Sequence, residues 1–138
     1  MTPLVRILFA ERIAWAAAQN GDAETCTRSL AAVDDAYADV GAEPEPHWVY
    51  WLNRDESDVM AARCHLRLGD PGRATALLRP AIDRYPADHK REKALYLSWL
   101  AEAHTVRGEL DAASTVVDEI EALDVDSARL RTRLKSLA

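Results

Sequence analysis

Three similar glycine turns divide the amino-acid sequence, and each lies between two segments with the residue spacing of amphipathic helices. The turns are Asn20-Gly21-Asp22, Leu68-Gly69-Asp70 and Arg107-Gly108-Glu109. Glycine adopts the left-handed backbone that ends many helices, and a polar residue that follows it can cap the next helix. We therefore expect three units of two paired helices. The glycines are 48 and 39 residues apart, so we expect loops of different length between the units.

Residue size recurs in register with these glycines. Relative to the glycine, position −7 holds Ala14, Ala62 and Ala101, position +5 holds Cys26, Ala74 and Ala113, position +9 holds Leu30, Leu78 and Val117, and position +12 holds Val33, Ala81 and Ile120. Small residues let two helices approach closely, and larger aliphatic residues fill the groove between them. These positions are therefore predicted to form the contact within each helix pair.

Capping and helix-breaking residues predict seven helices and no strand. The expected ranges are 3–19, 22–40, 53–68, 70–86, 88–107, 110–123 and 126–138. We expect N-terminal caps for six of these helices, at Thr2, Asp22, Asn53, Asp70, Asp88 and Asp126. Pro80 falls inside the fourth range, where proline removes a backbone hydrogen bond, so we expect a kink or an early end there.

The repeated unit resembles the tetratricopeptide repeat over residues 7–125. The resemblance implies an all-α fold, an antiparallel helix-pair solenoid of three degenerate repeats in a single domain, residues 1–138. We place the repeats at about 3–40, 53–86 and 88–125, with an aromatic insertion at 41–52 and a capping helix at 126–138. A terminal helix of this kind covers the apolar face of the last repeat.

A narrower resemblance rests on three segments, Trp48-Val49-Tyr50-Trp51-Leu52, residues 62–69 (ARCHLRLG) and residues 94–104 (ALYLSWLAEAH). They are similar to the C-terminal repeat part of helix-turn-helix transcriptional regulators of high-GC Gram-positive bacteria. In those proteins a DNA-binding domain precedes the repeats, which oligomerise or sense a ligand. We expect this chain to be such a region without the DNA-binding domain, as a fragment or a stand-alone relative.

Composition narrows the expected function. The chain has 138 residues, 49% apolar and 29% charged, with a net charge of −6, which is typical of a soluble globular protein. The acidic balance argues against direct nucleic-acid binding, and no apolar run is long enough to cross a membrane. Because two cysteines cannot form a disulfide framework, we expect a cytoplasmic protein.

Sequence motifs for catalysis or metal binding are absent. The glycines are isolated at helix ends and not gathered in a phosphate loop, and neither Cys-x-x-Cys nor His-Glu-x-x-His occurs. We therefore expect no enzyme activity, no cofactor and no metal. The preferred function is a protein- or peptide-interaction module that senses a ligand or oligomerises within a regulator. The alternatives are a stand-alone scaffold that binds a peptide or a protein C-terminus, and a helical-repeat enzyme of a biosynthetic pathway.

The resemblance also implies a binding face, since tetratricopeptide modules usually bind partners with the first helix of each pair. That face would present Glu11, Trp15, Arg63, Arg67 and Glu102. Arg63 and Arg67 are four residues apart and share a helix face, where guanidinium groups can hold a carboxylate by paired hydrogen bonds. We expect a partner with an acidic group or a C-terminal carboxylate; a homodimer is a further expectation.

The insertion contains the second candidate site. Trp48, Tyr50 and Trp51 occupy three of four consecutive positions, directly after a proline-rich stretch that favours extended backbone. Two interpretations stay open at this point: the rings line a ligand pocket, or they anchor the insertion against the helices.

Overall fold

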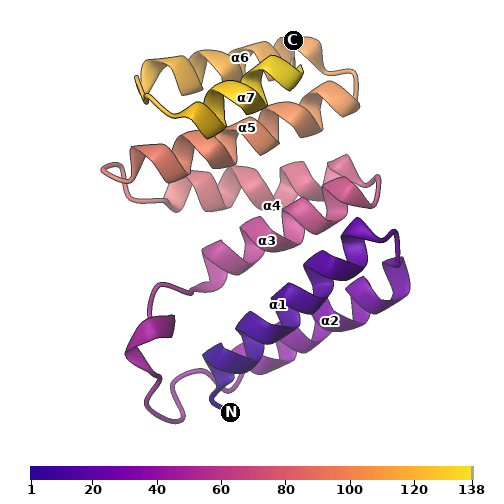
Figure 1. The fold of residues 1–138 in the computed structure, drawn as a ribbon, viewed down its shortest axis with the longest axis vertical. Helices are drawn as coiled ribbons and strands as arrows, with labels where there is room; N and C mark the ends of the chain where they lie inside the picture. Colours follow the sequence, from indigo (N-terminus) through magenta and orange to yellow (C-terminus); the bar gives the residue numbers. More distant parts are fainter. Residues whose placement is uncertain (138) are drawn as a thin grey trace. The chain divides into compact units, whose positions relative to one another are not determined.

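The computed structural model describes residues 1–137 and is all-α over them (Figure 1). Its elements are α1 (Pro3–Gln19), α2 (Ala23–Tyr37), the short 3-10 helix η1 (His47–Val49), α3 (Arg54–Arg67), α4 (Pro71–Arg84), α5 (Lys90–Val106), α6 (Leu110–Ala122) and α7 (Ala128–Leu137). The predicted fold class is confirmed: helices joined by short turns form tetratricopeptide-like pairs, and a further helix follows at the C-terminal end.

The chain forms two compact units, which we describe separately. The first comprises residues 1–69, where α1 packs along α2 and α3 packs on α1 (Figure 1). Two clusters of buried side chains hold it together. One gathers near the start of α1, and the other lies around Ala14, Ala17 and Ala18, where Cys26 of α2 and Cys64 of α3 meet α1.

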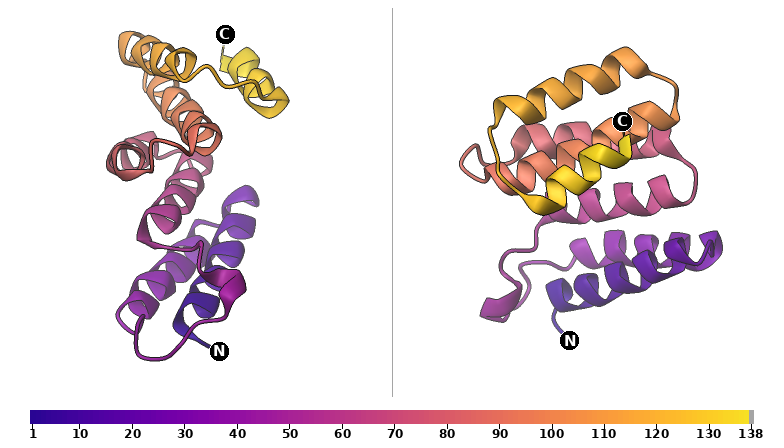
Figure 2. Two further views of the ribbon diagram at one scale, coloured as in Figure 1. Left: turned by 90° about the vertical axis from the view of Figure 1, so that its left-hand side faces the viewer. Right: turned by 45° about the horizontal axis from the view of Figure 1, so that its top comes forward.

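The second unit begins at Asp70. There α5 lies between α4 and α6 in the packing order, and α7 lies against α5 (Figure 2). Its fully buried side chains include Leu78, Ile82, Leu97 and Leu100. The side chain of Leu130 is the buried contact of α7, as expected for a terminal helix that lays one apolar face on its neighbour.

The glycine register agrees with the buried contacts. All three residues at position −7, at +5 and at +12 are buried, including Ala62 and Ala74, which are completely inaccessible. At position +9 only Leu78 is fully buried, while Leu30 and Val117 are partly exposed. The small residues at −7 and +5 and the residues at +12 thus agree with the predicted helix contacts, and position +9 agrees in part.

Glycine is required at the turns for its backbone conformation. Gly21 has φ +73° and Gly108 has φ +76°. After α1 the amide of Gly21 donates to Ala18 O and that of Asp22 to Ala17 O, so the last carbonyl groups of the helix are satisfied. A left-handed residue directly after the helix makes this pair of bonds possible, and glycine adopts it without a steric penalty.

Of the predicted N-cap residues, Thr2, Asp22, Asn53 and Asp70 hold that position, whereas Asp88 and Asp126 do not. Asp22, Asn53 and Asp70 each accept a hydrogen bond from the amide three residues ahead. Thr2 makes no such bond, and α5 begins after His89 instead of Asp88. Asp126 pairs with Arg131, while Ser127 Oγ accepts from the Leu130 amide at the start of α7.

Pro80 does not end its helix early. The α-helix α4 continues through it to Arg84. The ring itself is exposed, and the residues that follow it, Ala81 and Ile82, are fully buried. Packing of this last turn against the rest of the unit offsets the hydrogen bond that proline cannot donate.

Candidate partner-binding face and aromatic segment

Packing of α3 on α1 brings three of the predicted binding residues together. The guanidinium carbon of Arg63 lies 4.2 Å from the centre of the Trp15 ring, and that of Arg67 lies 5.9 Å from it. The two arginines are one turn apart on α3, so both side chains reach the same indole across the helix contact. The Trp15 ring is partly exposed, and we call these three residues the arginine–tryptophan cluster.

The chemistry of this cluster suits an anion. A guanidinium group is attracted to the face of an indole, and stacking holds the group in a defined plane. The N–H donors of a guanidinium group lie in its plane, in a geometry that matches the two oxygens of a carboxylate. Binding of a carboxylate here stays a prediction.

Glu11, the fourth predicted contact residue, lies in the interior of the first unit. Its side chain is only 3% exposed. Ser57 hydrogen-bonds to the carboxylate, and the Tyr37 hydroxyl in turn contacts Ser57 Oγ. Burial raises the pKa of Glu11 above its ordinary value, with the Ser57 hydrogen bond opposing that rise. Burial likewise raises the pKa of Tyr37 to about 12. Within residues 1–137, Glu11 Oε1 has no hydrogen-bond partner.

The burial of Glu11 predicts an unusual pH dependence of the free energy of unfolding. A carboxyl group whose pKa is higher in the folded state contributes its full stabilisation of that state at pH values below its unfolded-state pKa of 4.5. That contribution is lost as the pH rises through the folded-state pKa. We therefore expect Glu11→Gln to flatten the fall in unfolding free energy as the pH rises above 4.5. Urea titrations across that range measure the slope. The charged groups that act on Glu11 are Arg12, Glu56 and Arg54.

The matched control for that experiment is Glu24→Gln, because Glu24 is an exposed glutamate on the neighbouring helix α2. The Glu24→Gln variant should show the same dependence of unfolding free energy on pH as the wild-type protein. An identical slope for Glu11→Gln and wild type would show that the buried carboxyl group does not control this dependence.

Cys26 and Cys64 also meet inside the first unit. Their thiols lie in hydrogen-bond contact, and both side chains are buried. Burial raises the pKa of both, that of Cys64 to about 12. Buried neutral thiols pack as small apolar groups, which agrees with Cys26 occupying a small-residue position of the repeat.

Glu102, the last predicted contact residue, belongs to the second unit. Its carboxylate accepts a hydrogen bond from Arg133 of α7 at 2.8 Å. Arg133 also donates to Ser98 Oγ and to the Ser98 carbonyl oxygen, so it links α7 to α5. Sequence reasoning missed Arg133, because its contacts depend on how α7 folds back on α5.

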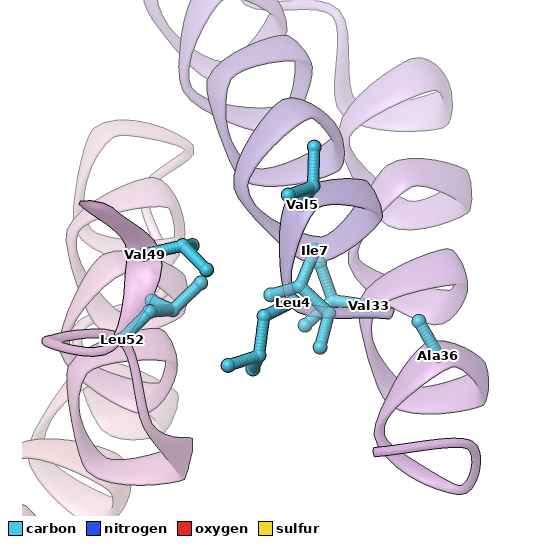
Figure 3. Close-up of a cluster of buried hydrophobic side chains, with 7 residues drawn as sticks. All are labelled: Leu4, Val5, Ile7, Val33, Ala36, Val49 and Leu52. Carbon is cyan, nitrogen blue, oxygen red and sulfur yellow. The ribbon is translucent and has the colours of Figure 1, made fainter. Parts of the chain in front are cut away.

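The aromatic segment, residues 47–52, is fixed by residues other than its rings. Val49 and Leu52 are buried and face Leu4 on α1 (Figure 3). Trp48 and Tyr50 are each 58% exposed and Trp51 is 53% exposed. The anchoring role thus falls on the two aliphatic side chains, which lie three residues apart and share one face of the 3-10 turn.

A carboxylate strengthens this attachment. Glu45 Oε2 accepts a hydrogen bond from the Leu4 amide at 3.1 Å, in the first turn of α1. Free amide groups at a helix start favour a negative charge, and the side chain of Thr2 does not supply a partner for them. Glu45 therefore caps α1 from a distance of 41 residues in the sequence.

Within residues 1–137, no three side chains of the metal-ligating types gather closely enough to hold an ion. None of the helices in that range combines the length and the apolar character needed to cross a bilayer.

Comparison with known proteins gives one family match. The tetratricopeptide repeat model matches residues 56–80, which span α3 and α4, and residues 94–119, which span α5 and α6. No curated protein and no solved structure matches the chain. Repeats of this family typically serve as non-catalytic modules that bind proteins or peptides. The chain therefore contains a tetratricopeptide-repeat-like region, with matches over two successive helix pairs.

Proposed function

We propose that this protein binds a partner protein or peptide through the arginine–tryptophan cluster. The observation that carries the proposal is the stacking of Arg63 on Trp15, with Arg67 beside it on the same ring. Two guanidinium groups held close together repel each other, and a bound carboxylate relieves that repulsion while it accepts paired hydrogen bonds. The partner offers an acidic side chain or its C-terminal carboxylate.

The narrower resemblance extends this proposal. It supports a non-catalytic role as the ligand-sensing or oligomerising region of a cytoplasmic transcriptional regulator, and not direct contact with DNA. The cluster belongs to the first unit, and we assign the partner contact to Trp15, Arg63 and Arg67. Glu11 is not part of the proposed contact, because its side chain is buried. Glu102 holds Arg133 in the second unit.

The test is a selection followed by titration. Random peptides with free C-termini, displayed against the wild-type protein, should enrich sequences that end in acidic residues. Replacing both arginines, Arg63→Ala with Arg67→Ala, should weaken binding of an enriched peptide by at least tenfold, and the double lysine variant should weaken it less. Lysine keeps the charge but cannot form the two-pronged contact. Calorimetry gives the affinities.

The control variant is Arg28→Ala, since Arg28 is an exposed arginine on α2 of the same unit. It should bind the selected peptide as tightly as wild type. Circular dichroism should show unchanged helix content in every variant, because none of these arginines is fully buried. Full affinity in the double alanine variant would exclude the cluster as the binding site.

A further inference from the structure

The aromatic segment presents its rings in an ordered arrangement. Three backbone hydrogen bonds, from Val49, Tyr50 and Leu52 to the carbonyl groups three residues before them, give it a threefold period. Residues three apart in a 3-10 turn eclipse each other. Val49 and Leu52 have this three-residue spacing and are both buried, while Trp48 and Trp51 have the same spacing and are both more than half exposed.

His47 and Tyr50 are likewise three residues apart. Their rings meet edge to face, with centroids 5.2 Å apart and an interplanar angle of 74°. The buried side chains and Glu45 hold this arrangement in place before any ligand arrives.

The surrounding sequence is strongly acidic. Residues 34–58 contain eight aspartate and glutamate side chains and one basic side chain, Arg54, for a net charge of −7. Arg54 is itself paired with Asp34 and Asp58. The exposed rings thus lie in a stretch of negative charge, which raises the local concentration of cations.

The chain's own arginines show the chemistry that such rings support. Arg63 stacks on Trp15, and the guanidinium carbon of Arg54 lies 4.8 Å from the centre of the Tyr37 ring. Indole gives the strongest attraction to a cation among the aromatic side chains, and aromatic clusters recognise cationic groups through the ring faces.

We propose that Trp48 and Trp51, with Tyr50 beside them, form a binding site for an arginine- or lysine-rich segment of a partner protein. A guanidinium or ammonium group contacts the exposed indole faces, while carboxylates such as Asp35 and Glu43 attract the rest of the basic segment. This site binds a cationic group, whereas the arginine–tryptophan cluster binds a carboxylate, so the two proposals do not depend on each other.

The probe for this site is a twelve-residue peptide of alternating arginine and alanine with a fluorescent label. Anisotropy titration at low salt should show saturable binding to the wild-type protein. The double variant Trp48→Ala with Trp51→Ala should bind it about tenfold more weakly, as expected for the loss of two cation–π contacts. Because this variant keeps the net charge, such a loss cannot come from weaker general electrostatic attraction.

Further variants sharpen the test. The phenylalanine variant, Trp48→Phe with Trp51→Phe, should bind with intermediate affinity, and it preserves the test if the alanine variant folds poorly. Val106→Ala with Leu110→Ala removes two exposed apolar side chains of the second unit and should bind as wild type does. Asp35→Asn with Glu43→Gln should weaken binding severalfold, and 300 mM salt should do the same.

Four results would overturn the proposal. One is equal affinity in the tryptophan-to-alanine and wild-type proteins. Another is equal binding of a peptide with glutamate in place of arginine. A third is the absence of binding at peptide concentrations up to the millimolar range. A fourth is concentration-dependent dimerisation, measured by sedimentation, that is lost with the two tryptophans, because the occupant would then be a second copy. The Arg63 and Arg67 variants should keep full affinity for the arginine peptide, so the two binding sites can fail independently.

Discussion

Replacing Leu52 by alanine is expected to lower the free energy of unfolding by about 2–5 kcal/mol. Leu52 is buried against the start of α1, where it packs with Val49 and Leu4. Removing its side chain leaves a cavity in the cluster that attaches the aromatic segment to the helices. Urea titration followed by circular dichroism measures the change.

The neighbouring substitution Trp51→Ala is the matched control. It removes a larger side chain, yet the Trp51 ring is more than half exposed, so the cost should stay within about 0.5 kcal/mol. If Trp51→Ala were the more destabilising of the two, the rings would anchor the segment and Leu52 would not. The pair therefore separates the attachment of the segment from its proposed binding role.

Replacing Ala74 by leucine should destabilise the protein by about 1–3 kcal/mol. Ala74 lies on α4 at the small-residue position of the repeat and is completely inaccessible. The added carbon atoms have no space unless α4 moves away from the helix packed against it. The midpoint of chemical denaturation reports the loss.

Ala76→Leu provides the comparison for Ala74. Ala76 lies two residues further along α4 and is exposed, so a leucine there meets solvent. The expected change is within about 0.5 kcal/mol, since both residues favour helix and no packing is disturbed. Equal effects of the two substitutions would contradict the glycine register from which the helix contacts were predicted.

Helix positions could be predicted from the sequence because their signals are local. Gly21, Gly69 and Gly108 mark helix ends, and Asp22, Asn53 and Asp70 cap helices through bonds that span only three residues. The start of α1 after Thr2 was predicted correctly, but its capping by Glu45 was not, because Glu45 is distant in the sequence. Local capping rules cannot include such a partner.

The candidate sites were predictable in part. The spacing of Arg63 and Arg67 predicts a shared face, and the repeat register places that face near Trp15. The burial of Glu11 was not predictable, since periodicity alone does not show which polar position lies beneath a neighbouring helix. In the insertion, large rings suggested anchors, but the threefold period of the turn gives the buried face to Val49 and Leu52.

The capping of α1 by Glu45 has a consequence for the order in which the chain assembles during synthesis. The antiparallel pair α1 and α2 can close as soon as residue 37 has left the ribosome, because its contacts are between neighbours in the sequence. The first turn of α1 must wait until residues 45–52 are made, when Glu45 and Leu52 reach Leu4. A nascent chain with residues 1–40 outside the ribosome should therefore carry a frayed N-terminal turn that proteases cleave, and one with residues 1–69 outside should resist them.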